Sequence, residues 1–159
     1  MPRESFVCLD NTGAAKTKIR VTVADDNRNM LQALVAALSS EFDVVATAAD
    51  GRSALDQIRA LQPSVAVLDL SMPELNGIEV TREIKRQRLA CEVVICSVES
   101  DSDIIEAGLE AGALGYVLKP AMNRDLETVV KCVARGELFV SGEGPHAAQR
   151  NSRTKMITL

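Results

Sequence analysis

Apolar and polar positions along this chain follow two alternating patterns. Short apolar runs, each expected to form a strand, occupy residues 19–24, 44–46, 65–68, 93–96 and 115–118. The stretches between and after these runs place apolar residues at helical spacing, as in Met30, Leu31, Leu34, Val35 and Leu38. The run 65–68 has no polar interruption, which is typical of a strand covered on both faces in a parallel sheet. Five strands that alternate with five helices predict an α/β fold, a doubly wound parallel sheet with helices on both faces.

The expected domain covers residues 18–138, because the alternation is confined to them. Residues 1–17 are polar and are expected to form a flexible leader. Residues 139–159 are expected to be a linker or tail, since Gly, Ser, Asn, Gln and Arg dominate from residue 141 onward.

Length and charge exclude some classes of protein. A chain of 159 residues suits one domain, and a formal net charge of −4 argues against a nucleic-acid surface on it. No apolar run approaches the roughly 20 residues that a membrane span needs. We therefore expect a cytoplasmic protein that does not bind a membrane.

Four of the apolar runs end in a polar functional group. The groups that follow or close these runs are Asp25 with Asp26, Asp69, Ser97 and Lys119. The carboxyl ends of parallel strands meet at one edge of a sheet, where open α/β sheets place their binding sites. The sequence therefore predicts that three carboxylates, one hydroxyl group and one ammonium group converge.

Such a cluster suits the transfer of a phosphoryl group. Three crowded carboxylates repel one another unless a cation joins them, and oxygen ligands of this kind suit Mg²⁺. Lys119 is a point charge suited to phosphate oxygens, and Ser97 can donate a hydrogen bond to another oxygen. An aspartate nucleophile that attacks phosphorus, with its charge neutralised by a metal ion and a lysine, is a known form of phosphoryl transfer.

These residues resemble the receiver domains of two-component response regulators. The matching pieces are Asp25-Asp26, the run Asp-Leu-Ser-Met-Pro-Glu-Leu-Asn-Gly that begins at Asp69, then Ser97, Tyr116 and Lys119-Pro120. The resemblance covers about residues 18–138 and implies a flavodoxin-like fold with strand order 2-1-3-4-5. It implies that Asp69 accepts a phosphoryl group from a sensor histidine kinase or a phosphotransfer protein. The chain would then not be an enzyme that acts on other molecules, since it would catalyse only its own phosphorylation and dephosphorylation.

The resemblance also implies a Mg²⁺ site. Asp26 and Asp69 would bind the ion directly, together with the backbone carbonyl of Ser71. Asp25 would act through a water molecule. The peptide bond before Pro120 is expected to be cis, as is typical of the family.

A conformational switch is a further implication of the resemblance. Ser97 and Tyr116 look like the switch pair, in which Tyr116 turns inward after phosphorylation. Val98 departs from the small residue that is usual after the switch hydroxyl group, which affects the expected lifetime of the phosphoryl group. The helix expected over 101–113 contains Gly108 and Gly112, each of which costs about 1 kcal/mol relative to Ala. We therefore expect residues 98–116 to be the part that changes conformation.

The amino-acid sequence resembles the subfamily of regulators with a C-terminal helix-turn-helix, termed LuxR/NarL-like. The chain ends in an apolar cluster, Met156, Ile157 and Leu159, where that subfamily continues into its DNA-binding domain. We expect control of transcription through a C-terminal output domain absent from this chain, and no DNA binding by residues 1–159 alone. The alternative is a stand-alone receiver that acts as a protein-interaction module. The resemblance also allows a homodimer to form on phosphorylation.

Two other functions remain open on the sequence alone. An aspartate-nucleophile phosphatase would carry a second Asp two residues after the nucleophile, where this chain has Ser71. A pseudo-receiver, which only binds partners, would not need the acidic cluster that this chain keeps. Acetyl phosphate with Mg²⁺ distinguishes the three: a receiver retains an aspartyl phosphate, a phosphatase turns over, and a pseudo-receiver does neither.

Overall fold

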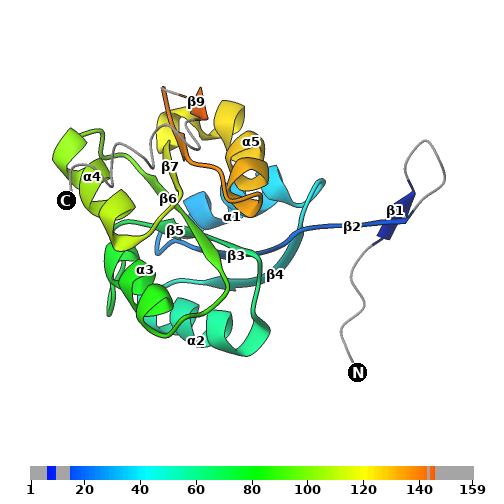
Figure 1. Ribbon diagram of the computed structural model, residues 1–159, viewed down its shortest axis with the longest axis horizontal. Coiled ribbons are helices and arrows are strands. Elements are labelled where there is room, and N and C mark those ends of the chain that lie inside the picture. Colours follow the sequence, from blue (N-terminus) through cyan, green and yellow to red (C-terminus); the bar gives the residue numbers. More distant parts are fainter. Residues whose placement is uncertain (1–6, 10–14, 143, 146–159) are drawn as a thin grey trace.

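The computed structural model describes residues 7–9, 15–142 and 144–145 of the chain, and the central sheet of Figure 1 dominates it. Its parallel strands are β3 (Arg20–Ala24), β4 (Asp43–Ala48), β5 (Val65–Asp69), β6 (Glu92–Ser97) and β7 (Gly115–Leu118). They lie in the order β4-β3-β5-β6-β7, which confirms the expected order 2-1-3-4-5.

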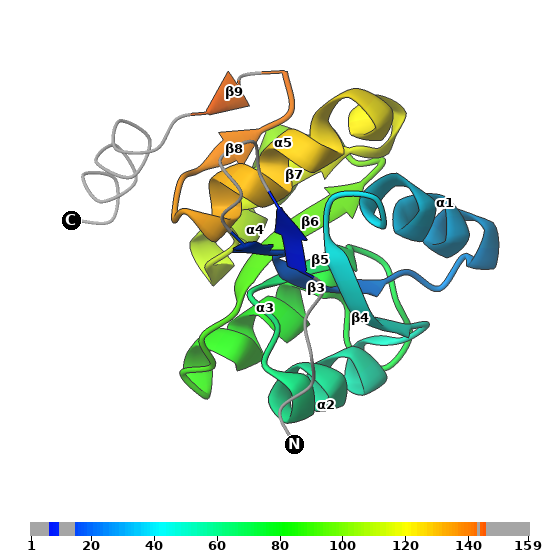
Figure 2. The ribbon, with the colours of Figure 1, turned by 90° about the vertical axis from the view of Figure 1, so that its right-hand side faces the viewer.

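Helices cover both faces of this sheet (Figures 1 and 2). They are α1 (Arg28–Leu38), α2 (Gly51–Leu61), α3 (Gly77–Arg86), α4 (Ser102–Ala111) and α5 (Met122–Ala134). Successive residues of a strand point to opposite faces. In β5, accordingly, Val65 and Val67 join the core under α1 and α5, whereas Ala66 and Leu68 join the core under α2 and α3. The doubly wound arrangement is therefore confirmed.

Short polar side chains cap the N-termini of three helices that follow strands of the sheet. The side chains of Asn27, Asp50 and Asn76 accept hydrogen bonds from the backbone N–H groups of Met30, Ser53 and Glu79. At α3 the Glu79 side chain also accepts from the Asn76 N–H, which completes a capping box. These caps begin each helix at a defined residue beyond the carboxyl end of a strand, so the loops that carry the functional groups lie at that edge of the sheet.

The sheet extends beyond residue 138, where the sequence analysis placed a linker. β8 (Phe139–Val140) pairs in parallel with β7, and β9 (Gly144–Pro145) pairs antiparallel with β8, so the sheet has seven strands. Leu138 and both residues of β8 are buried. Burial of these apolar side chains explains why this segment stays against the domain.

Two further strands lie in the region expected to be a flexible leader. β1 (Val7–Leu9) and β2 (Ala15–Thr17) form an antiparallel pair, which is a separate two-stranded sheet. The apolar cluster expected at Met156, Ile157 and Leu159 lies outside the described residues. Across the described part of the chain, no helix combines the length and the apolar character that crossing a membrane requires.

Candidate functional site

The polar groups predicted to converge lie together at the carboxyl edge of the sheet. Asp69 is the last residue of β5 and Ser97 the last of β6, whereas Asp25 follows β3 directly and Lys119 follows β7. Oxygen atoms of Asp25, Asp26 and Asp69 all lie within 4.8 Å of one another. The sequence prediction of a shared site is thus confirmed for the carboxylates.

The ammonium group of Lys119 bridges two of these carboxylates. Its Nζ atom lies 2.9 Å from Asp25 Oδ2 and 3.0 Å from Asp69 Oδ1, and the Lys119 side chain is only 13% exposed. Little water screens such a partly buried contact. Lys119 therefore neutralises part of the negative charge of the cluster.

Asp25 and Asp26 differ in their surroundings. Asp25 is 1% exposed, and its Oδ1 atom accepts a hydrogen bond of 2.8 Å from the backbone N–H of Asn27. Asp26 is exposed. The three carboxylates offer the oxygen ligands that Mg²⁺ prefers, so the residues present fit this ion. Asp26 is the carboxylate most open to an ion from solvent.

The pKa values in the cluster reflect burial first. Burial raises the pKa of Asp69, the negative charges of Asp25 and Asp26 raise it further, and a hydrogen bond from Lys119 opposes them. Burial lowers the pKa of Lys119, but its hydrogen bonds to Asp25 and Asp69 outweigh this, so that the pKa of Lys119 is raised overall. The charged form of Asp69 is therefore destabilised by the fold, while Lys119 stays protonated.

This raised pKa predicts how Asp69→Asn changes stability in EDTA. An acid whose pKa is higher in the folded state makes stability fall as the pH rises from the unfolded value, 3.8, through the folded value. At pH 7 the Asn variant should therefore melt higher than the wild type. The difference should vanish near pH 3, where Asp69 is protonated in both states.

Calorimetric melts across this pH range measure the effect. Asp56→Asn, which changes an exposed carboxylate on α2, is the control and should show no comparable gain. A variant at position 69 that melts below the wild type at pH 7, or gains equally at pH 3, would contradict the raised pKa.

Ser97 and Tyr116 both contact the backbone of Glu99. The Ser97 Oγ atom accepts a hydrogen bond of 3.0 Å from the Glu99 N–H, and the Tyr116 hydroxyl group donates one of 2.8 Å to the Glu99 carbonyl oxygen. Tyr116 is 0% exposed, and burial raises the pKa of its hydroxyl group. The structure thus shows Tyr116 in an inward position; movement of Tyr116 on phosphorylation remains a prediction. Val98 is 68% exposed beside Ser97, and its effect on the phosphoryl lifetime also stays a prediction.

Gly108 lets α4 lie close to this pair. A Cβ atom at position 108 would lie 2.9 Å from Ile95 Cδ1 and 3.8 Å from a ring carbon of Tyr116. A side chain at position 108 would therefore require the Ile95 Cδ1 atom to move, so this glycine favours the packing of α4 on the sheet. Sequence reasoning identified only its helix propensity, because nothing in the local sequence shows which side chains face a helical glycine.

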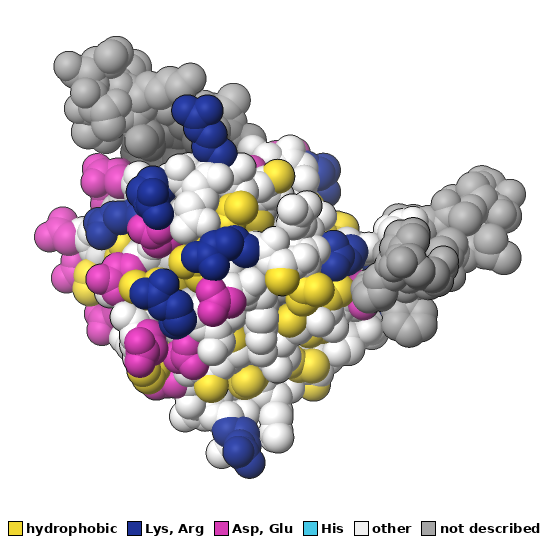
Figure 3. Space-filling view, turned by 90° about the horizontal axis from the view of Figure 1, so that it is seen from below, with side chains coloured by type: hydrophobic (Ala, Val, Ile, Leu, Met, Phe, Trp, Pro, Cys, Tyr) yellow, Lys and Arg dark blue, Asp and Glu magenta, His cyan; other side chains and the backbone are white. Residues whose placement is uncertain are grey.

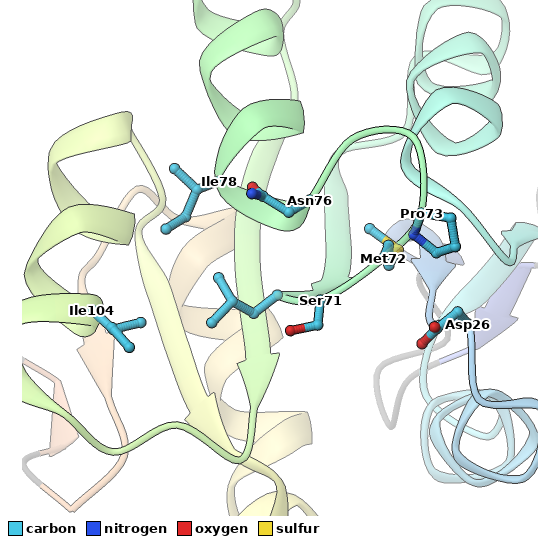
Figure 4. Close-up of a pocket in the computed structure, with 8 residues that line it drawn as sticks. Asp26, Ser71, Met72, Pro73, Asn76, Ile78 and Ile104 are labelled. Carbon is cyan, nitrogen blue, oxygen red and sulfur yellow. The ribbon is translucent and has the colours of Figure 1, made fainter.

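An open hollow of about 530 Å³ lies beside the carboxylates (Figure 4). Its walls come from the loop after β5, from α3 and α4, and from Asp26; they are Asp26, Leu70, Ser71, Met72, Pro73, Asn76, Ile78 and Ile104. Figure 4 shows the Asp26 and Ser71 side chains on opposite sides of the space next to this loop. Ser71 thus lines the same hollow as Asp26, and the role of the Ser71 carbonyl group stays a prediction.

Two glycines hold the loop after Asp69 against α2 and β5. The Gly51 N–H donates a hydrogen bond of 3.1 Å to the Pro73 carbonyl oxygen. A Cβ atom at position 51 would lie 1.9 Å from the Leu75 carbonyl oxygen, and one at position 77 would lie 2.5 Å from the Asp69 carbonyl oxygen. Both positions therefore need glycine. Sequence reasoning missed Gly51 as a support of the site.

The peptide bond before Pro120 is trans, so the expectation of a cis bond was wrong. Residues Lys119–Ala121 form a 3₁₀ turn that leads directly into α5, with Pro120 near its start. A proline suits this place because its fixed φ angle matches the first positions of a helix and its missing N–H needs no partner there. The trans bond is also the more stable form of the peptide.

Comparisons with known proteins agree with this geometry. A sequence model of the family described as the response regulator receiver domain matches residues 21–131. The transcriptional regulatory protein DegU of Brevibacillus brevis is 30% identical over 138 residues, which are 86% of this chain and 58% of that protein. The transcriptional regulatory protein LnrK of Bacillus subtilis is 33% identical over 117 residues, 72% of this chain and 52% of that protein. The chain thus spans just over half the length of these relatives.

Solved structures show the same fold. The signal receiver domain of a response regulator named NarL, from Mycobacterium tuberculosis, is 34% identical with a TM-score of 0.73, over 75% of this chain and 98% of that chain. A LuxR-family response regulator from Aurantimonas sp. SI85-9A1 is 27% identical with a TM-score of 0.74, over 88% of this chain and 99% of that chain.

Proposed function

Because this chain belongs to the response regulator receiver domain family, we propose that it accepts a phosphoryl group on Asp69 from a sensor histidine kinase or a phosphotransfer protein. The observation that carries the proposal is the contact of Asp69 Oδ1 with Lys119 Nζ at 3.0 Å, inside a cluster of three carboxylates beside an open hollow. A nucleophile at position 69 would lie next to a cation, and Asp26 of the same cluster lines the hollow.

The transfer uses Asp69 as the nucleophile. An oxygen of its carboxylate attacks phosphorus, the new O–P bond forms, and the P–N bond to the donor histidine breaks. The imidazole nitrogen keeps the electron pair of that bond and takes up a proton. Lys119 contacts a phosphoryl oxygen, and the Ser97 hydroxyl group donates a hydrogen bond to another.

Mg²⁺ would be held by Asp26 and Asp69, with Asp25 acting through water and the Ser71 carbonyl oxygen as a further ligand. When bound, the ion neutralises charge on the carboxylates and on the phosphoryl oxygens. The fit rests on oxygen ligands that lie within 4.8 Å of one another.

Acetyl phosphate tests the proposal. The chain should gain one phosphoryl group by intact mass in the presence of Mg²⁺ and lose it slowly. Rapid release of free phosphate with continuing turnover would instead indicate a phosphatase, and no uptake would indicate a pseudo-receiver. We propose that the chain catalyses only its own phosphorylation and dephosphorylation.

Magnesium should stabilise the fold through Asp26 more than through Asp25, because Asp26 is exposed while Asp25 already contacts Lys119 and the Asn27 N–H. At about ten times its Kd, Mg²⁺ should add about 1.4 kcal/mol to the free energy of unfolding. Asp26→Ala should lose most of this gain. Thermal melts with and without Mg²⁺ measure it, and Asp103→Ala on α4 serves as the control. An Asp26→Ala chain that keeps the full gain would contradict the assignment.

Phosphorylation should change the segment from Val98 to Tyr116. An aspartyl phosphate adds about −1.5 to −2 charges close to Ser97, and the Ser97 hydroxyl group can turn from the Glu99 N–H toward them. Because Tyr116 contacts the same residue and packs on α4, the change would reach that helix. Amide chemical shifts on adding beryllofluoride should therefore change most in this segment. Changes confined to the loop after Asp69 would count against the switch.

The output of the whole protein follows from its relatives. DegU and LnrK are named transcriptional regulatory proteins, and this chain covers 58% and 52% of them. We propose that the full-length protein controls transcription in the cytoplasm, through a C-terminal DNA-binding domain and a homodimer formed on phosphorylation. Residues 1–159 alone should not read DNA, since their formal net charge is −4. On the face in Figure 3, Lys and Arg side chains are interspersed with acidic ones.

A further inference from the structure

The segment after α5 pairs with the strand that leads to Lys119. Figure 2 shows β8 near β7 and α5, and the ladder places Phe139 opposite Gly115 and Val140 opposite Tyr116. The Ser141 N–H donates a hydrogen bond of 2.8 Å to the Tyr116 carbonyl oxygen. Phe139, Val140 and Ser141 lie beyond residue 131, where the match to the family ends.

The last N–H group of β7, that of Leu118, donates to a side chain and not to the backbone of β8. β8 ends at Val140 and the chain turns at Gly142, which has a φ of +84°. The Leu118 N–H donates a hydrogen bond of 3.0 Å to Ser141 Oγ, and the Ser141 hydroxyl group donates one of 3.2 Å to Asp125 Oδ2. We call the group of Ser141, Leu118 and Asp125 the Ser141 clasp.

The clasp is itself fixed from α5. Asp125 is 8% exposed and accepts two hydrogen bonds from Arg124, of 2.9 Å from Nε and 3.1 Å from the terminal nitrogen. Its carboxylate lies in the first turn of α5, where the helix dipole favours negative charge. Asp125 can therefore hold the hydroxyl group of Ser141 in one direction, with its oxygen lone pair toward Leu118.

The backbone of Lys119 lies between two such restraints. On one side is the clasped N–H of Leu118, and on the other the Lys119 carbonyl oxygen accepts a hydrogen bond from the Met122 N–H. A rotation of the Leu118–Lys119 peptide unit would move the Lys119 Nζ atom, which lies within 3.0 Å of both of its carboxylate partners.

We infer that Ser141 is a positioning residue for Lys119: the clasp fixes the end of β7 so that the ammonium group stays at the phosphorylation site. This inference rests on the proposed function, because Lys119 acts there on the phosphoryl group. The hydrogen bond from Leu118 also links Ser141, which lies after the last helix, to the residue that directly precedes Lys119. Serine suits the position because its hydroxyl group accepts and donates at once.

Ser141→Ala in the chain of residues 1–159 tests the inference, with Ser141→Thr as the conservative variant. Ser64→Ala, an exposed serine at the opposite edge of the sheet, is the matched control. Amide hydrogen exchange at Leu118 should become about tenfold faster in the Ala variant, since one hydrogen bond is lost. The rate of labelling by acetyl phosphate, measured well below the melting temperature of each variant, should fall by about tenfold as Lys119 moves. Thr should restore both values, and the control should change neither.

Different outcomes overturn different statements. Unchanged Leu118 exchange in Ser141→Ala overturns the clasp. Faster exchange at Leu118 with labelling at the wild-type rate overturns the positioning role. A serine with a purely structural role would affect stability and hydrogen exchange but not the labelling rate. A wild-type chain that takes up no phosphoryl group contradicts the proposed function instead, and it does so whatever the exchange of Leu118 shows.

Discussion

Asp69→Asn should abolish phosphoryl uptake from acetyl phosphate while the chain stays folded. The amide has the size of the carboxylate but is uncharged and is no nucleophile toward phosphorus, so no acyl phosphate can form. The Lys119 ammonium group keeps Asp25 as its partner at 2.9 Å. The loss should be complete by intact mass.

Asp56→Asn is the matched control for this experiment, because it makes the same chemical change on the exposed surface of α2. It should label as the wild type does. If the Asp69→Asn chain took up a full equivalent, another side chain would be the acceptor and the assignment of Asp69 would be wrong. The same preparation should also show the higher melting temperature at pH 7 described above, which confirms that the fold is intact.

The fold and the cluster at the strand ends could be predicted because both follow from local patterns. The alternation of strands and helices makes the sheet parallel, and an apolar run that ends in Asp69 then places that residue at its carboxyl edge. The same holds for Ser97, which closes β6 and is buried. Caps such as Asn76 reinforce the pattern, since they end the loops at defined residues.

The remaining features depend on contacts between residues far apart in the chain. Gly51 is essential only because the loop with Leu75 returns to it. Ser141 reads as a linker residue until β8 is seen beside β7. The trans bond before Pro120 accompanies the helical turn that starts there. The spacing of apolar residues in the sequence does not indicate which isomer this peptide bond adopts.

Lys119→Met should reduce the rate of labelling by acetyl phosphate by about 10²–10³-fold, the usual effect of removing one group that stabilises charge in a transition state. Methionine keeps the length and most of the apolar contacts of the side chain, so the loss is mainly that of the charge. It should also destabilise the chain in EDTA, because the three carboxylates lose the cation that lies 2.9 and 3.0 Å from two of them.

Mg²⁺ separates these two effects of Lys119→Met. The ion can replace the missing positive charge beside Asp25, Asp26 and Asp69, so it should restore much of the lost stability. It cannot replace the ammonium group that contacts the phosphoryl group, so labelling should stay slow at saturating Mg²⁺. Lys131→Met, which removes a lysine of α5 with an exposed ion pair, should change neither the labelling rate nor the response to Mg²⁺. Labelling of Lys119→Met within about threefold of the wild type, well short of the loss expected for such a group, would show that Lys119 holds the carboxylates together without acting on the phosphoryl group.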